Sequence, residues 1–421
     1  MIDRDLPPRA PFRLPIRVIE EGGITAWLVE DGAVPVVSLA WAWGGGASLD
    51  PEGQEGRAGL AAGMLMEGAG DLDHLAFADA VRDAGLSLQF GAGRDAFSGS
   101  LRATVDALPE GLRLARLAMT APRLDAAAFD RLRARAVVSA RQALESPRGV
   151  ASRAFWAAAF PGHPAGRSAT PESLSAMAAD AMREALATQL RRGGIRLAAA
   201  GALDEATLRQ AIRTLFLDLP PGAPPEAAPL PPMARFPRRV VAFPAPQSTV
   251  LFGQDALAPA DPEWEAMQVV LRILAGGGFT SRLMREIREQ RGLTYGIGAG
   301  LEVLFRRAII LGQGSTDNAT AAEMIRLVEA AWERMASEGP TEEELREATD
   351  FLAGSLPLQF SDTRRIAGGL LSLMQNDRSP EWLAGRPARL AALTRERVAA
   401  AAQRLGREPL RLVVAGQPQG L

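Results

Sequence analysis

Cysteine and lysine are absent from this 421-residue chain, which also has only one tyrosine and two histidines. Without cysteine the chain can form no disulfide, thiolate metal site or cysteine nucleophile. All 47 basic residues are therefore arginines, and 49 acidic residues bring the net charge to −2. The sequence thus has no broad basic field of the kind that nucleic acids or anionic membrane surfaces attract.

The two histidines are too scattered to form a metal site by themselves. His74 and His163 lie far apart, and neither has a histidine or glutamate at helical ligand spacing. A zinc site needs three or four nitrogen, oxygen or sulfur donors that converge tetrahedrally. We therefore expect no metal site within this chain, and we interpret His163, in a Pro/Gly loop, as structural or solvent-exposed.

Motifs for nucleophilic or nucleotide chemistry are also missing. No G-x-S-x-G element is present, and GGGFTS lacks the Lys-Ser/Thr ending of a P-loop. We interpret Gly276, Gly277 and Gly278 as a glycine-rich loop that permits a close approach of the chain.

Long apolar segments are absent too. No run approaches the length of a membrane span, and the first residues, MIDRDLPPRAPFRLP, contain no apolar core of signal-peptide length. If an export signal exists, we expect it to have been removed before this numbering begins. A hydrophobic content of 47% at a mean hydropathy near zero is typical of a globular protein with ample core.

A proline-rich segment, LPPGAPPEAAPLPPMARFP, lies just past the midpoint. Such a segment cannot sustain the interior of a helix or sheet, and it is typical of an extended, semi-rigid linker. A chain of this length is also too long for one ordinary core. We therefore predict an N-terminal domain over residues 1–218, a linker over 219–238 and a C-terminal domain over 239–421.

A weak internal repeat indicates that the two domains are alike. LQFGAG at 88–93 resembles YGIGAG at 295–300, and in both halves a strand pair, a helix, a proline-containing turn and a long charged helix follow. We predict an α+β fold of two homologous domains. Each would be a mainly antiparallel β-sheet with helices packed on one face.

The start of the first domain predicts a hairpin. Ile24–Val29 and Val36–Trp43 are apolar, β-leaning runs, and Glu30, Asp31 and Gly32 between them form a plausible turn. Helices are expected further along, at about residues 57–67, 75–84, 108–120 and 125–144.

The stretch from Gly276 to Gly300 contains the single tyrosine. Its apolar residues recur at spacings of three and four, which predicts a helix that ends near Arg291, with Gly292 at the stop. Alternation from Tyr295 onward predicts a strand. The turn between them would bring Tyr295 back toward Arg288, seven residues earlier. The alternative is a buried tyrosine with its hydroxyl satisfied and an exposed arginine.

Several longer strings resemble one known family. TSRLMREIREQRGLTYGIGA is similar to the C-terminal signature of the M16 family of pitrilysin, insulinase and mitochondrial processing peptidase. AFPGHPAGRSATPESL, the terminal strand LRLVVAGQP, the linker and the duplicated halves also resemble that family. The resemblance runs from about Gly22 to Pro418. It is strongest to bacterial members whose two halves are joined in a chain of this length.

The resemblance implies that a metal site has been lost. Active members carry an inverted zinc motif, H-x-x-E-H, on a helix of the first half. At the matching positions this chain has Gly59 and Gly63 for the two histidines and Ala62 for the general-base glutamate. The third ligand, a later glutamate, would fall at about Ser139. We therefore expect no metal in this chain, and each helical glycine costs about 1 kcal/mol relative to alanine.

The same resemblance implies a role for the second-half pair. In the family, an arginine and a tyrosine at this separation reach the zinc site from the C-terminal half, and they match Arg288 and Tyr295. The family's pair is thought to hold the substrate backbone and the oxygen that becomes negatively charged. Donors aimed at such developing charge can each contribute ~2.7–4 kcal/mol.

These matches lead to one functional expectation and two alternatives. We expect a zinc-less subunit of a heterodimeric metallopeptidase that is inactive alone, in which a zinc-binding M16 paralogue supplies the metal and peptides are the substrates. The alternatives are an inert structural or assembly protein and a peptide-binding, chaperone-like homodimer. We expect no nucleic-acid partner and no membrane span. The periplasm is the expected location, with the cytoplasm as the alternative.

Overall fold

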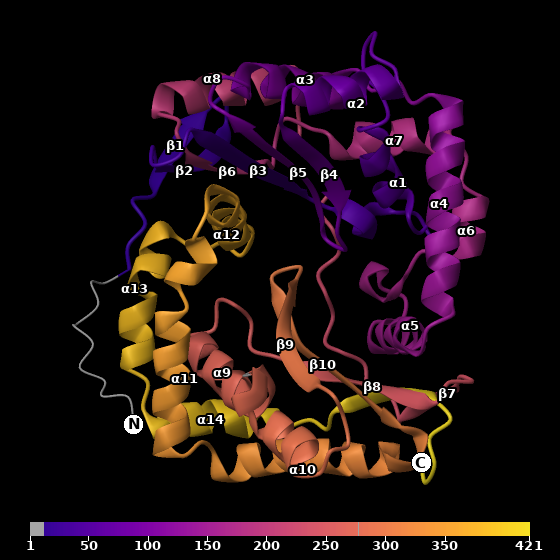
Figure 1. The fold of residues 1–421 in the computed structure, drawn as a ribbon, viewed down its shortest axis with the longest axis vertical. Coiled ribbons are helices and arrows are strands. Elements are labelled where there is room, and N and C mark those ends of the chain that lie inside the picture. Colours follow the sequence, from indigo (N-terminus) through magenta and orange to yellow (C-terminus); the bar gives the residue numbers. More distant parts are fainter. Residues whose placement is uncertain (1–11, 277) are drawn as a thin grey trace.

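The computed structural model describes residues 12–276 and 278–421, which form two α+β halves joined by an extended segment (Figure 1). Each half contains one sheet, and most helices of that half cover one face of it. The predicted α+β fold of two homologous domains is therefore confirmed. Within these residues no helix is long and apolar enough to cross a membrane.

The first sheet has six strands among the described residues, and β2 and β6 form its one parallel pair. Its spatial order is β1 (Arg17–Glu21), β2 (Ile24–Glu30), β6 (Arg196–Gly201), β3 (Val36–Gly44), β5 (Ala96–Thr104) and β4 (Ser87–Ala92).

The second sheet has five strands in the described chain and repeats that arrangement without a counterpart of β1. Its spatial order is β7 (Arg239–Ala242), β11 (Arg411–Gly416), β8 (Gln247–Asp255), β10 (Arg307–Asp317) and β9 (Ile297–Leu304). The β7–β11 pair is parallel, like β2–β6, and the remaining pairs are antiparallel. Each strand of the second sheet thus has an equivalent in the first.

The predicted hairpin between β2 and β3 is wrong. Strand β6 lies between them, parallel to β2 and antiparallel to β3. The sequence of β6, RLAAAG, explains the insertion, because its alanines are fully buried and fit between two strands that are themselves buried on both faces. The residues after Glu30 lead β2 across β6, and Asp31 N–H donates to the Gly201 carbonyl.

The helices of the first half follow the sequence expectations closely. They are α1 (Arg57–Met64), α2 (His74–Asp83), α3 (Leu108–Thr120), α4 (Ala126–Leu144), α5 (Pro147–Ala159), α6 (Pro171–Ser175), α7 (Asp180–Gln189) and α8 (Glu205–Phe216). Those of the second half are α9 (Trp264–Leu271), α10 (Ala321–Glu338), α11 (Glu342–Gly354), α12 (Thr363–Gln375), α13 (Pro380–Ala391) and α14 (Arg395–Leu405).

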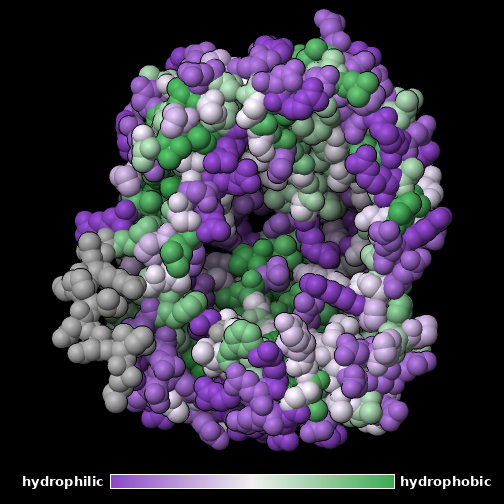
Figure 2. Space-filling view, viewed as in Figure 1, coloured by the Kyte–Doolittle hydropathy of each residue, from purple (hydrophilic) through white to green (hydrophobic). Residues whose placement is uncertain are grey.

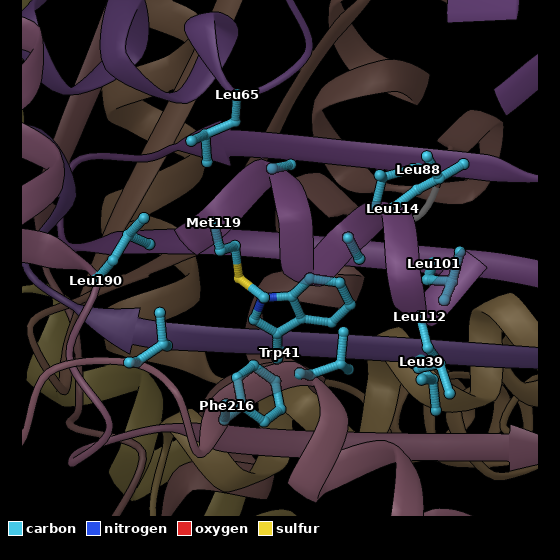
Figure 3. Close-up of a cluster of buried hydrophobic side chains, with 14 of the residues drawn as sticks. Leu39, Trp41, Leu65, Leu88, Leu101, Leu112, Leu114, Met119, Leu190 and Phe216 are labelled. Carbon is cyan, nitrogen blue, oxygen red and sulfur yellow. The ribbon is translucent and has the colours of Figure 1, made fainter. Parts of the chain in front are cut away.

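Trp41 of β3 lies at the centre of the first core, beside Met119 and Phe216 (Figure 3). Its neighbour on β5 is Gly99, where a Cβ would lie only 2.3 Å from the indole ring. The second core has the same arrangement. Gly312 of β10 pairs with Phe252 of β8, and a Cβ on Gly312 would lie 2.3 Å from the phenyl ring. A glycine opposite a large ring is therefore part of the repeated unit.

The other face of each sheet is covered in part by a helix from the opposite half. Helix α12 packs its apolar side onto β3 and β6 of the first sheet, and α5 packs onto β8 and β11 of the second (Figure 1). This exchange ties the two halves together through two apolar clusters. It also extends the predicted picture, in which helices covered one face only.

The tip of the β9–β10 hairpin reaches the first half. Its two turn residues, Phe305 and Arg306, have φ angles of 50° and 61°. Asp95 accepts the Phe305 N–H at 2.7 Å, and Asp377 pairs with Arg306 at 3.0 Å and with Arg196 of the first half at 2.8 Å. These contacts hold a left-handed turn that is uncommon for residues other than glycine.

Residues 219–238 contain no helix or strand and run between the halves. Leu230 and Met233 are buried against α5 and the second sheet, so the segment packs along the interface. The His163 ring is hydrogen-bonded to this segment. Its Nδ1 accepts the Ala165 N–H, so its Nε2 donates to the Ala228 carbonyl. A cavity of about 730 Å³ lies beside this segment, and Figure 2 shows the face hollowed between the two halves.

Candidate functional site

The segment that carries Arg288 departs from the regular helix that its spacing predicts. It consists of a 3₁₀ turn at Gly278–Thr280 and a π-helical stretch at Met284–Glu289. The wider turns end where Gly292 N–H donates to the Arg288 carbonyl, and Gly292 has a φ of 65°. The glycine stop is therefore confirmed, whereas the helix type is wrong. π-Helical stretches are rare and occur frequently at functional sites.

Tyr295 lies in the turn before β9, which begins at Ile297, two residues later than predicted. The preceding Thr294 is 8% exposed, and its hydroxyl donates to the Ser315 carbonyl at 2.7 Å and accepts the Gly296 N–H at 3.1 Å. These two bonds fix the backbone on both sides of Tyr295. The tyrosine side chain is 92% exposed.

The alternative of a buried tyrosine with a satisfied hydroxyl is therefore wrong. Within the described residues the Tyr295 hydroxyl has no hydrogen-bond partner, and its ring lies outside every apolar cluster. An exposed, unpartnered phenol is free to donate to a ligand.

Arg288 lies against two aromatic rings. Its Cζ is 4.5 Å from the Phe279 ring centroid and 5.6 Å from that of Tyr295. No ion pair or hydrogen bond joins the Arg288 guanidinium to another residue of the described chain, so the rings position it and leave its charge uncompensated. Phe279 is 62% exposed and sits at the end of the glycine-rich loop. Arg288 and Tyr295 therefore share a patch, as their spacing predicts.

A groove of about 700 Å³ begins at Tyr295 and runs along the second sheet. Its floor and walls come from β8, β9 and β10 and from the first turns of α5. They are Arg148, Ser152, Gln247, Thr249, Leu251, Thr294, Tyr295, Gly296, Ile297, Gly298, Ala299, Gly300, Glu302, Leu311, Gly312, Gln313, Gly314 and Ser315. The tyrosine is thus next to a space large enough for an extended peptide segment.

The glycine-rich loop adjoins the same strand. Gly276 ends the π-helical turn Arg272–Gly276, and a Cβ on it would lie 3.5 Å from the Ala299 carbonyl oxygen. Gly278 has a φ of 60°, which favours glycine. Gly277 lies outside the described residues.

The first-half motif positions lie on α1 and α4. Gly59 is exposed and a Cβ on it would meet no atom within 4 Å, whereas one on Gly63 would lie 3.3 Å from Leu132 of α4. Ala62 is buried in the first core, and Ser139 is exposed on α4. None of these four residues lines the groove beside Tyr295.

These residues do not fit a zinc ion. Gly59, Ala62 and Gly63 have no side-chain donor, and the Ser139 hydroxyl is a single neutral oxygen. In residues 12–276 and 278–421 no three His, Asp or Glu side chains converge to hold a metal.

Asp50 of the first half is a carboxylic acid whose pKa is strongly shifted. Its carboxylate accepts the Gly56 N–H at 3.0 Å and the Ala58 N–H at 2.8 Å, so it caps α1. Burial raises the pKa of Asp50 to about 6, against the lowering effect of the two hydrogen bonds. Because both acceptor bonds serve the helix, we assign Asp50 a structural role.

Sequence reasoning missed three residues near the pair: Phe279, Thr294 and Arg148. Phe279 could have been found as the one aromatic of the glycine-rich loop, and Thr294 as the neighbour of Tyr295. Arg148 carries no such signal, because α5 comes from the other half of the chain and only the tertiary structure places it at the groove.

Comparison with known proteins adds a family context. Residues 176–352 match the family model described as the peptidase M16 inactive domain. A Helicobacter pylori protein named non-peptidase homolog YmxG is 24% identical over 333 residues, which cover 78% of this chain and 77% of that protein. An uncharacterised zinc protease of Streptomyces coelicolor is 28% identical over 252 residues, covering 57% and 54% respectively.

A solved structure extends the similarity to the whole fold. The crystal structure of a peptidase M16 inactive domain from Pseudomonas fluorescens superposes with a TM-score of 0.88 at 25% identity. The match covers 96% of this chain and 98% of that one.

Proposed function

This chain is an inactive member of the M16 peptidase family, and from that premise we propose that it is the zinc-less subunit of a heterodimeric metallopeptidase. Its partner would be a zinc-binding M16 paralogue, and its substrates would be peptides. In this proposal the chain donates Arg288 and Tyr295 to peptide binding and oxyanion stabilisation.

One observation carries the proposal: the donors of the second half are intact and accessible, whereas the metal positions of the first half have no donors. Tyr295 is 92% exposed, and Arg288 is held between Tyr295 and Phe279 with its charge uncompensated in the described chain. A purely structural tyrosine would bury its ring and satisfy its hydroxyl. The arrangement therefore favours a ligand that arrives from outside the chain.

The geometry supports a defined role for each side chain. The Tyr295 hydroxyl can donate one hydrogen bond to a peptide carbonyl oxygen as that oxygen gains negative charge. The Arg288 guanidinium adds a fixed positive charge and further N–H donors beside it. Preorganised donors of this kind contribute ~2.7–4 kcal/mol each in other enzymes. Metal chemistry belongs to the partner, and no step of it is assigned to this chain.

The proposal is tested by co-expression with a zinc-bearing paralogue from the same organism. The two chains should co-purify, the zinc should follow the partner, and peptide cleavage should require both chains. If the complex keeps full activity with Tyr295→Phe and Arg288→Ala, the proposed role is wrong. Stoichiometric zinc bound tightly to the isolated chain would also contradict it.

A second candidate is a peptide-binding or assembly protein without any role in catalysis. The name of the Helicobacter pylori relative, a non-peptidase homologue, favours this candidate. It predicts that the isolated chain binds peptides and that no paralogue increases their cleavage. The periplasmic location remains a prediction, which fractionation of the source cells would check.

A further inference from the structure

We propose that the groove beside Tyr295 is a specificity subsite that binds an extended peptide and prefers a basic side chain at Glu302. This inference rests on the proposed function, because it names which part of the substrate this chain would recognise. The occupant is the segment of the peptide that continues from the residue held at Tyr295.

The floor of the groove is the part of the second sheet that α5 leaves uncovered. Cross-strand pairing places Leu251, Gln313 and Gly298 in one row across the sheet. Leu251 packs under α5, so the same row leads from the covered part of the face to the open part. The groove is therefore bounded by α5 on one side and by β9 on the other.

Two glycines of β9, Gly298 and Gly300, lie on the same face of the strand at this side of the floor. Close packing explains Gly298, because a Cβ there would lie 3.0 Å from the Ala275 carbonyl oxygen. A Cβ on Gly300 would meet no atom within 4 Å, and Gly300 does not have a positive φ. Neither packing nor backbone conformation requires glycine at this position. The missing side chain of Gly300 therefore serves to keep the groove open.

Some of the polar side chains that line the groove have no partner in the described chain. They include the Tyr295 hydroxyl, the Gln313 amide, the Ser152 hydroxyl and the Arg148 guanidinium, all of which line the groove. A peptide backbone in an extended conformation offers alternating N–H and C=O groups that such donors and acceptors can satisfy. Because the groove offers both hydrogen-bond donors and acceptors, it can bind the main chain of a peptide without requiring a strict sequence.

Glu302 supplies a negative charge that a basic side chain of the substrate can recognise. It is exposed, lines the groove and forms no ion pair with another described residue. Arg94 lies close enough to interact electrostatically with Glu302, but it forms no ion pair with it. Its guanidinium donates to the Ala165 carbonyl at 2.6 Å and stacks on Trp156 at 4.0 Å. A lysine or arginine of the peptide could therefore pair with Glu302.

The strand geometry sets the position of that basic residue. Ile297 and Glu302 are both in β9, and at roughly 3.3 Å per residue the strand spans about 17 Å between them. An extended peptide that starts at Tyr295 would reach Glu302 after about five to seven residues. The register predicts one preferred lysine position, at that distance and on one side of the scissile bond.

The test uses the reconstituted complex and a series of neutral peptides with a single lysine moved along each side of the scissile bond. We expect KM to be lowest for one lysine position five to seven residues away, by roughly three- to tenfold. Glu302→Gln should remove this minimum, so that the KM of the lysine-containing peptides rises to that of the lysine-free peptide measured with the same variant. A flat series in the unmodified complex, or a minimum that survives Glu302→Gln, would overturn the inference.

A second variant tests the groove without any catalysis. Gly300→Val should weaken binding of a fluorescent neutral peptide to the isolated chain by roughly tenfold or more, because the side chain fills the floor. Gly91→Val on β4, the equivalent edge strand of the first half, is the matched control: its Cβ would meet only Ser98, at 3.9 Å. Equal binding by both variants would overturn the inference.

The two proposals fail differently. If Tyr295→Phe abolishes cleavage but the lysine series is flat and Gly300→Val binds normally, the groove is wrong and the proposed function stands. If Gly300→Val alone abolishes peptide binding but no paralogue complex cleaves, the groove stands and the subunit role is wrong.

Discussion

The two halves of this chain share one strand order and differ at the positions that carry chemistry. In the first half α1 is a regular helix, with Ala62 in the core and no donor at Gly59 or Gly63. In the second half, π-helical and 3₁₀ turns replace regular helix around Arg288 and Phe279. The regular side of the duplicated fold therefore has no side-chain donor at these positions, whereas the irregular side presents exposed donors at Arg288 and Tyr295.

The difference shows which parts of a repeat are under structural constraint. Core positions are equivalent in both halves, as the Trp41–Gly99 and Phe252–Gly312 pairs illustrate. Exposed positions are not, because nothing in the packing fixes them. Tyr295 contributes no core contact, so a structural requirement does not explain it.

The largest expected effect concerns this contrast directly. Tyr295→Phe should lower kcat of the reconstituted complex by roughly 10²- to 10³-fold, because one hydrogen-bond donor to the developing charge is removed. The matched change in the first half, Gly59→Ala, should leave kcat unchanged. It should also raise the free energy of unfolding by about 1 kcal/mol, since alanine favours the helix. If both substitutions lowered kcat by the same factor, the two halves would not differ in their contribution to catalysis.

The pH dependence of stability tests the first half next, where Asp50 caps α1. Burial raises the pKa of Asp50 to about 6 from 3.8, so between these values the folded state binds the proton more tightly than the unfolded state. The free energy of unfolding therefore falls as pH rises through this window, by up to about 3 kcal/mol from this group. Asp50→Asn should remove that decline in urea titrations at pH 4 and pH 7.

A control with the opposite sign is available on α2. Hydrogen bonds from the Ala76 and Leu75 N–H groups lower the pKa of Asp73, which is exposed. Its contribution to stability is present above its ordinary pKa and is lost as pH falls. Asp73→Asn should therefore reduce the loss of stability as pH falls below about 4, whereas Asp50→Asn should act between pH 4 and pH 6 and with the opposite sign. A loss of stability on acidification from pH 6 to pH 4 that depends on Asp50 would contradict its assigned burial.

A smaller effect is expected at Phe279, which positions Arg288. Exposed cation–π contacts contribute about 0.5–1 kcal/mol, so Phe279→Ala should lower kcat/KM of the complex by roughly two- to fivefold. Phe279→Trp should restore most of the loss, because the indole face attracts a guanidinium at least as well. A merely structural residue would not show this recovery, and failure of the tryptophan variant would argue against the stacking role.

An effect of similar size, on stability instead of catalysis, is expected at the contact between the halves. Asp377 pairs with Arg196 and Arg306, and its φ of 51° is a conformation that asparagine also tolerates. Asp377→Asn should lower the free energy of unfolding by about 0.5–1 kcal/mol, less at high salt. Glu110→Gln, which breaks the exposed pair with Arg113 inside α3, is the control within one half. A larger loss for Glu110→Gln would contradict an inter-half role.

Local patterns predicted most of the elements. The apolar spacing of Leu108–Thr120 and the alternation of Ala96–Thr104 each depend on contacts that recur within a few residues, and both elements form as expected. The β2–β3 hairpin failed because a strand more than 150 residues later, β6, fits between them. The regular helix at Arg288 failed because periodicity does not distinguish α from π turns over one or two turns.

The sequence by itself determined the duplicated α+β fold, the absence of side-chain donors at Gly59, Ala62 and Gly63, and the approach of Tyr295 to Arg288. These follow from residue identity and short-range spacing, which any compact fold must respect. Only the tertiary structure decided that Tyr295 is exposed, that Phe279 stacks on Arg288, and that α5 of the opposite half forms the groove wall. Burial and contact between distant segments depend on how the two halves pack, and no local pattern contains that information.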